Sequence, residues 1–248
     1  MAFDLTCVIT GHREGRVCVP SLRSFEIAVA EAETAGVTVE TLYFLDNPDD
    51  LTRSLFMRYA RSAELVEEVS FRDQGLVRNV AVSKAKGRYI AFLDADDLWA
   101  RTWLTDAVGF LRAEGSGVIA HPAYNYFFEA TASIFVHVDS EAVDFDLDLL
   151  RVQNYWDALC LCETDIYRSF PFAERDIDAG WAYEDWFWNC ETFAAGIRHK
   201  VVPGTVLFKR RQRMSQTIRA SINKSRIRPN GLSRYDSPLY DIKSGGAS

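Results

Sequence analysis

Short apolar runs and amphipathic stretches alternate along the first half of the chain. The apolar runs have the length of strands, and the segments between them carry apolar residues at the three-to-four-residue spacing of a helix. This alternation predicts a parallel sheet whose strands are joined by right-handed helical crossovers. The predicted strands cover residues 5–10, 39–45, 65–69 and 89–93, and the predicted helices cover residues 21–35, 51–61 and 75–86.

The second half of the chain is less regular. Its strand-like runs cover residues 118–120, 124–128, 133–138 and 201–209, and a helix-like stretch covers residues 183–195. We therefore expect an α/β fold with a Rossmann-like, mainly parallel sheet flanked by helices. A smaller mixed sheet is expected beside it, followed by a basic C-terminal extension.

Three carboxylates end the apolar run of residues 89–93. Because ligands of open α/β sheets bind beyond the carboxyl ends of the strands, these acids lie where a ligand would bind. Asp94 and Asp96 are two residues apart, so a strand end that bends into a loop can aim both at one point. Such oxygen donors suit Mg²⁺ or Mn²⁺, and the ion would bind a diphosphate. The alternative is a solvated loop, or a helix cap formed by Asp96 or Asp97.

Two further segments carry candidate binding chemistry. Asp46 ends its strand on the same sheet edge, where its carboxylate could accept the N3–H of uracil or thymine; an Asx-turn before Pro48 is the alternative. Residues 73–79 place a glycine and Arg78 in the first turns of a helix, where free N–H groups favour an anion. A surface arginine is the alternative interpretation there.

Glu184 and Asp185 lie among bulky aromatic residues near a helix start. Aromatic neighbours desolvate a carboxylate and raise its pKa, which suits a general base. Their flat faces could also pack against sugar rings. The alternative is a capped helix whose aromatic residues simply fill the core.

Charge and cysteine usage limit the remaining classes. The net charge of −7 argues against general nucleic-acid binding. Between Glu191 and Asp236 the chain carries eleven Lys and Arg residues and no acid, which indicates an anion-binding or membrane-surface element, or a solvated basic tail. The five cysteines lack the paired spacing of a zinc site, so reduced thiols in a cytoplasmic protein are expected. No run approaches the roughly 18 apolar residues of a membrane span, so any membrane contact is expected to be peripheral.

In this order the elements resemble the inverting glycosyltransferases of family 2, which have the GT-A fold. The resemblance covers about residues 4–215 and is carried by Asp46 and by residues 75–81, 87–99 and 183–186. It implies a metal-dependent enzyme that moves a sugar from a nucleoside-diphosphate sugar, of the UDP or dTDP type, to a hydroxyl of a saccharide or lipid-linked saccharide. Cell-envelope polysaccharide synthesis at the inner face of the membrane is the expected setting.

The resemblance also assigns roles to residues of this chain. It implies that Asp185 is the catalytic base, that Glu184 and Trp186 bind the acceptor, and that Asp96 holds Mn²⁺ or Mg²⁺. A segment after the last strand would close over the diphosphate. The residues expected to bind the nucleotide are Thr10, His12, Asp46, Asp73, Arg78, Asp94, Arg211 and Arg213, with Arg210 and Ser215 in the closing segment.

The expected domain is residues 1–215, with a nucleotide-binding half at about 1–100 and an acceptor half at 101–215. Residues 216–248 form the basic extension, expected to be partly disordered, and the chain could be part of a larger multidomain glycosyltransferase. Two rival classes stay open: a sugar-phosphate nucleotidyltransferase, and a non-catalytic module that binds sugar nucleotides or glycans. The released product separates them, because a transferase releases nucleoside diphosphate, a nucleotidyltransferase releases pyrophosphate, and a module releases neither.

Overall fold

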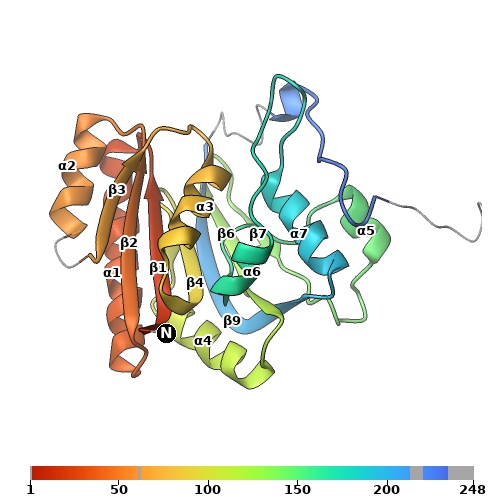
Figure 1. Ribbon diagram of the computed structural model, residues 1–248, viewed down its shortest axis with the longest axis horizontal. Helices are drawn as coiled ribbons and strands as arrows, with labels where there is room; N and C mark the ends of the chain where they lie inside the picture. The colour runs from red at the N-terminus through yellow and green to blue at the C-terminus, as the bar shows by residue number, and fades with distance from the viewer. Residues whose placement is uncertain (1, 61–62, 213–219, 234–248) are drawn as a thin grey trace, which may run out of the picture.

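Four parallel strands form the first half of one nine-stranded sheet (Figure 1). The computed structural model describes residues 2–60, 63–212 and 220–233. β1 (Phe3–Gly11) lies between β2 (Val39–Asp46) and β4 (Gly87–Asp94), and β3 (Leu65–Val69) pairs with the outer side of β2. The apolar runs form β1, β2 and β4 because side chains on both faces of these strands are buried, whereas β3 lies at the sheet edge and is only partly buried. Their carboxyl ends therefore meet at one edge of the sheet.

Helices cover both faces of this parallel part (Figure 1). α1 (Cys18–Thr34) follows β1 after a short 3₁₀ turn, η1 (Gly15–Val17), and packs against α4 (Trp103–Glu114). α2 (Asp50–Tyr59) joins β2 to β3 and also packs against α1. On the other face α3 (Gln74–Lys84) packs against α6 (Thr164–Ser169). The predicted α/β class, with a mainly parallel sheet flanked by helices, is confirmed.

The mixed strands continue the same sheet. β8 (Leu161–Glu163) runs antiparallel to β4, and β6 (Val118–Glu129) runs antiparallel to β8. β9 (Arg198–Arg211) is parallel to β6, while β5 (Leu98–Trp99) and β7 (Ser133–Val136) add antiparallel pairs. The sequence predicted two strands at 118–120 and 124–128, and this division was wrong. Pro122 sits inside one long strand because the register against β9 shifts there, which leaves room for a proline.

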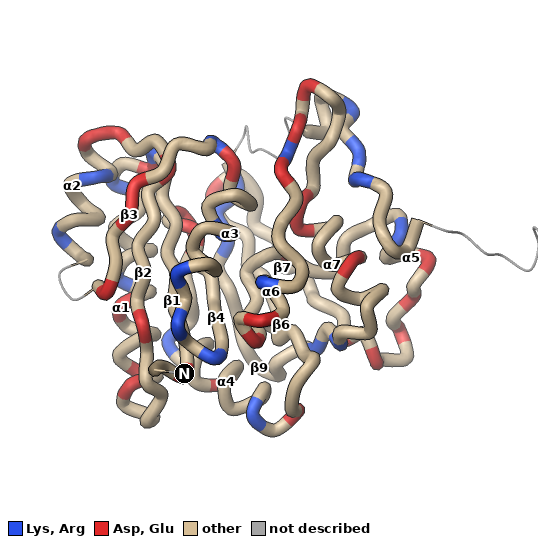
Figure 2. Tube along the Cα trace, viewed as in Figure 1, with Lys and Arg blue, Asp and Glu red and all other residues tan. Residues whose placement is uncertain are grey.

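A second, smaller apolar cluster lies around α5 (Leu147–Val152) and α7 (Glu184–Ala194). It is centred on Leu150, Tyr155 and Trp156, and Leu232 packs into it from the C-terminal segment. That segment, residues 220–233, also pairs with the loop before α7, where Trp181 bridges to Arg226. Figure 2 shows basic positions of this segment beside acidic positions of the loop. The described part of the predicted basic extension is therefore packed against α7 and its loop.

Candidate functional site

The carboxyl ends of β1, β2 and β4 bring four predicted binding residues together. Thr10 pairs with Asp94 in the register of β1 and β4, and its hydroxyl donates to the Asp94 carboxylate at 3.3 Å. On the other side of β1, Nδ1 of His12 bonds to the backbone carbonyl of Asp46. Since a carbonyl only accepts, Nδ1 carries the proton in this bond. The parallel order of the strands thus produces a polar edge, as the sequence predicted.

Asp94 is held by side chains of α3. Its Oδ1 accepts from Nη2 of Arg78 at 2.8 Å and from the amide of Gln74. Arg78 is 3% exposed and lies between the rings of Phe92 and Phe172, whose centroids are 5.9 and 5.6 Å from its guanidinium carbon. The surface-arginine interpretation is therefore wrong. The buried ion pair of Arg78 with Asp94 fixes the position of the Asp94 carboxylate at this edge.

Asp46 and Asp73 both engage the backbone. Oδ1 of Asp46 accepts from the amide of Asn47 at 2.7 Å and from the backbone N–H of Phe71 at 2.8 Å. These bonds tie the end of β2 to the loop after β3. Asp73 caps α3 by accepting from the N–H of Gly75 at 2.8 Å, and its other oxygen accepts from the N–H of Arg175 at 2.8 Å. Contact of either carboxylate with a nucleotide stays a prediction.

Asp96 and Asp97 lie in the turn between β4 and β5, and neither caps a helix. The residue before α4 is Thr102, so the cap interpretation is wrong. Asp96 accepts from the amide of Gln212 at 3.1 Å, and burial together with the charge of Asp94 raises its pKa. Asp97 is buried and accepts from the backbone N–H of Arg210 at 2.7 Å, and burial raises its pKa well above the ordinary value.

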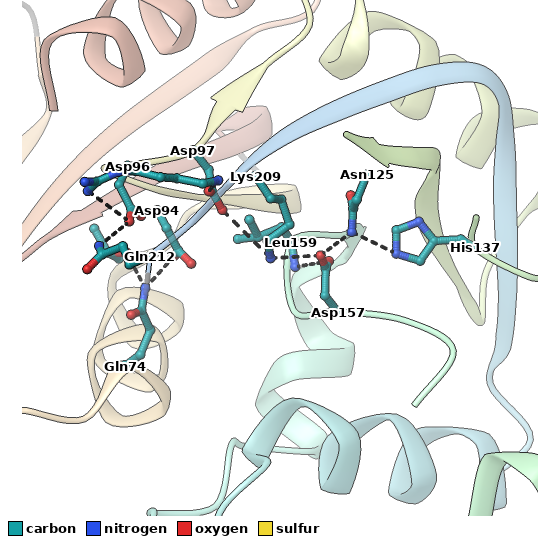
Figure 3. Close-up of polar contacts among 12 residues, drawn as sticks. Gln74, Asp94, Asp96, Asp97, Asn125, His137, Asp157, Leu159, Lys209 and Gln212 are labelled. Atoms are coloured by element: carbon teal, nitrogen blue, oxygen red, sulfur yellow. Dashed lines mark hydrogen bonds and ion pairs between the residues drawn. The ribbon is translucent and has the colours of Figure 1, made fainter. Parts of the chain in front are cut away.

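The donor atoms of this turn suit a divalent ion that is shared with a substrate. Among the residues that the structure describes, no group of three or more His, Cys, Asp or Glu side chains could hold a metal by itself. Mg²⁺ characteristically binds through one or two carboxylates and completes its shell with water and phosphate oxygens. Asp94 and Asp96, neighbours in one turn (Figure 3), fit this mode of binding.

Asp185 and Glu184 begin α7 and face different surroundings. Burial, followed by the negative charge of Glu184, raises the pKa of Asp185 to about 6. Glu184 lies 3.8 Å from the guanidinium of Arg175, which also pairs with Asp73. The pKa of Asp185 is raised, which agrees with the expectation for an acid in aromatic surroundings. A carboxylate with a pKa near 6 can accept a proton at neutral pH.

The aromatic residues of α7 have structural contacts. The indole of Trp186 donates to the carbonyl of Leu150 at 2.7 Å, which ties α7 to α5. Trp188 is buried and stacks on Tyr167 with ring centroids 4.6 Å apart. The core interpretation therefore holds for Trp188. A contact of Trp186 with an acceptor stays a prediction.

Sequence reasoning missed a buried polar network between the β4 turn and the acceptor half (Figure 3). Nζ of Lys209 lies 2.9 Å from Asp157 and 3.8 Å from Asp97. Asp157 also accepts from the amide of Asn125 at 2.7 Å and from the N–H of Leu159 at 2.9 Å. Although burial favours its neutral form, the ammonium of Lys209 lowers the pKa of Asp157. Lys209 was visible only as one cation of the acid-free interval, and Asp157 belongs to no motif.

The end of β9 carries the first residues of the predicted closing segment. Arg210 forms an ion pair with Glu129, in which Nη2 of Arg210 lies 3.0 Å from Oε1 of Glu129. Nη1 of Arg210 lies 3.9 Å from Oδ2 of Asp96. The guanidinium carbon of Arg211 lies 4.0 Å from the ring centroid of Phe127. Arg213 and Ser215 fall outside the described residues. Closure over a diphosphate stays a prediction.

Residues 36–170 match the sequence profile of glycosyl transferase family 2. A UDP-Glc:alpha-D-GlcNAc-diphosphoundecaprenol beta-1,3-glucosyltransferase, WfaP of Escherichia coli, is 51% identical over 106 residues, which are 42% of this chain and 41% of the relative. The putative teichuronic acid biosynthesis glycosyltransferase TuaG of Bacillus subtilis strain 168 is 33% identical over 69 residues, 27% of each chain. The matched segments thus span less than half of either relative.

Solved structures share the fold at low sequence identity. The S. aureus protein TarS, residues 1–349 in complex with UDP, superposes with a TM-score of 0.64 at 16% identity, over 84% of this chain and 61% of that one. A mannosyltransferase from Pyrobaculum calidifontis, PcManGT, in complex with GDP-Man and Mn²⁺, gives a TM-score of 0.57 at 17% identity, over 84% of this chain and 57% of that one. Among the described residues, none of the helices is both long and apolar enough to cross a membrane.

Proposed function

The chain belongs to glycosyl transferase family 2, and from this membership we propose that it is a metal-dependent, inverting enzyme that uses a nucleoside-diphosphate sugar. It transfers the sugar to a hydroxyl of a saccharide acceptor. The observation that carries this proposal is the buried network from the β4 turn through Lys209 to Asp157, whose charges act on Asp185. The network connects the sheet edge that suits a diphosphate with Asp185, the acid that suits the role of base.

The donor occupies the edge formed by β1, β2 and β4. Its base lies toward Asp46 and His12, and its ribose or sugar lies toward Asp94, with Thr10, Asp73 and Arg78 lining the same side. Asp96 would hold Mn²⁺ or Mg²⁺, which would supply positive charge to offset the negative charge of the leaving diphosphate. The buried guanidinium of Arg78 keeps Asp94 in place and adds positive charge to this side.

The acceptor approaches from the side of α7. The carboxylate of Asp185 removes the proton of the acceptor hydroxyl as its oxygen bonds to the anomeric carbon. The bond from that carbon to the diphosphate oxygen breaks, and the diphosphate leaves with the electron pair. A single displacement inverts the anomeric centre. Glu184 and Trp186 hold the acceptor, and Arg211, the last residue of β9, binds the diphosphate together with Arg213.

The names of the relatives support a donor of the UDP type and a lipid-linked saccharide acceptor. WfaP is named for a UDP-glucose donor and a diphosphoundecaprenol-linked acceptor, and TuaG for teichuronic acid biosynthesis. We place the reaction in cell-envelope polysaccharide synthesis, on the cytoplasmic side of the membrane. Residues 1–100 bind the nucleotide, residues 101–215 bind the acceptor, and residues 216–248 are the basic C-terminal extension.

A product assay tests this function. The protein is incubated with UDP- or dTDP-sugars, Mn²⁺ and candidate saccharide acceptors, and the released phosphates are identified. We expect nucleoside diphosphate that depends on both acceptor and metal, and a glycoside of inverted anomeric configuration. Pyrophosphate as the product would indicate a nucleotidyltransferase, and donor binding with no product from the whole panel would indicate a binding module.

A further inference from the structure

Lys209 is a largely buried cation with partners in both halves of the candidate site. Its side chain is 16% exposed, and the side chains of Asp97 and Asp157 are 4% and 16% exposed. Asp97 belongs to the turn that follows β4, whereas Asp157 precedes β8 and is fixed further by Asn125 and Leu159. One ammonium therefore joins the donor edge to the acceptor half (Figure 3).

Lys200, on the same strand, shows what an ordinary ion pair looks like in this fold. Its side chain is 15% exposed and lies 3.3 Å from Asp139 and 2.6 Å from Glu141. Glu141 is 51% exposed, so water screens that pair. The partners of Lys209 have far less access to water, and loss of its ammonium leaves the Asp157 charge buried and uncompensated. The two lysines thus match in residue type and exposure and differ in their surroundings.

We propose that Lys209 is a positioning residue for glycosyl transfer. It joins Asp97 to Asp157 and offsets the effect of the negative charge of Asp157 on Asp185. This inference rests on the proposed function in taking Asp185 as the base. Lys209 touches neither the acceptor nor the reacting carbon. It acts through its positive charge, which lies beside the carboxylates of Asp97 and Asp157.

The charged groups that act on Asp185 come from three elements. Glu184 lies on the same helix, Asp157 lies in the segment before β8, and Lys209 lies on β9. Burial and the negative charges of Glu184 and Asp157 favour the neutral carboxyl of Asp185, whereas the positive charge of Lys209 favours the carboxylate. Removal of the lysine charge therefore makes Asp185 harder to ionise.

The direct test is a ¹³C-carboxyl NMR titration of Asp185 in the unliganded protein, with the Asp185→Asn variant to assign its signal. In Lys209→Met we expect the midpoint to rise above the value of about 6, because the charge that favours the carboxylate is gone. Lys209→Arg keeps the charge and should keep the midpoint close to the wild-type value. Lys200→Met is the matched control and should leave the midpoint unchanged.

The pH profile of kcat/KM gives a second readout. If the midpoint rises from about 6 to about 7, the ionised fraction of Asp185 in Lys209→Met falls about fivefold at pH 6 and about twofold at pH 7, and is unchanged at pH 9. A loss of equal size at all three pH values would indicate a structural role and overturn the proposal. Asp157→Asn should shift the profile the other way, to lower pH, because it removes a negative charge.

The two readouts separate this inference from the proposed function. An Asp185 midpoint that stays the same in Lys209→Met, or that shifts equally in Lys200→Met, overturns the role of Lys209 whether or not the enzyme turns over. Absence of product from the wild-type protein contradicts the proposed function, while the NMR titration still decides the influence of Lys209. Should Lys209→Met fail to fold, the Asp157→Asn midpoint decides instead: a fall supports the charge arrangement, and no change overturns it.

Discussion

Three buried histidines should make the protein sensitive to mild acid. His121 on β6, His199 on β9 and His137 just after β7 lie together. Nε2 of His121 is 3.0 Å from Nδ1 of His199, and Trp156 stacks on His199 with ring centroids 4.0 Å apart. Burial lowers the pKa of His199 to about 3, and it also lowers the pKa of His121 and of His137. The folded protein therefore keeps these rings neutral at a pH where the unfolded chain protonates them.

For His199, the sign and size of the effect on the free energy of unfolding follow from its pKa values in the folded and unfolded chain. With an ordinary pKa of 6.5 in the unfolded chain and about 3 in the fold, its contribution to stability is complete above pH 6.5. The contribution is lost as pH falls from 6.5 toward the folded value. Between pH 8 and pH 5 the free energy of unfolding should fall by about 2 kcal/mol through His199 alone. Asp185 acts in the opposite direction, because its raised pKa lets the folded state take up a proton near pH 6.

Urea unfolding of the wild-type protein and a His199→Gln variant at pH 8, 6 and 5 isolates this contribution. The variant is expected to start less stable, because it loses the stack on Trp156, and to lose about 2 kcal/mol less than the wild type between pH 8 and pH 5. Equal losses in the wild type and His199→Gln would refute the assignment of a neutral, buried His199.

Two further predictions concern the donor edge. Asp96→Ala should weaken Mn²⁺-dependent nucleotide binding by at least about tenfold, because it removes a carboxylate from a site with few protein donors; isothermal titration measures the change, and wild-type affinity in the variant would contradict the metal assignment. Saturating nucleotide should slow amide hydrogen exchange across residues 209–220, since cations at the end of β9 gain an anionic partner; unchanged exchange would favour the solvated-tail interpretation.

The parallel half of the fold was predictable because its signals are local. The run at 65–69 is a strand with the predicted bounds, and Asp46 and Asp94 end strands where the apolar runs stop. The helix α4 was not predicted, although Leu104, Val108 and Leu111 follow helical spacing in the sequence. The short strands β5 and β8 have two and three residues, too few to show a period.

The candidate site was only partly accessible from sequence, for a physical reason. Asp46, Asp94 and Asp185 each stand beside a strand end or a helix start, so a local pattern marks them. The contact between Asp157 and Lys209 joins residues 52 positions apart. It exists because β6 lies between β8, which follows Asp157, and β9, which carries Lys209, and nothing near either residue in the chain indicates the other.

The central claim is that Asp185 is the base for glycosyl transfer, and a comparison of two nearly isosteric variants tests it most directly. Initial rates of nucleoside diphosphate release are measured for Asp185→Asn and Glu184→Gln, with donor affinity measured alongside. Asp185→Asn should keep the fold and the donor affinity while kcat falls by at least about a hundredfold, and Glu184→Gln should retain turnover. Normal turnover by Asp185→Asn with an inactive Glu184→Gln would exchange the two roles, and normal turnover by both variants would contradict the mechanism.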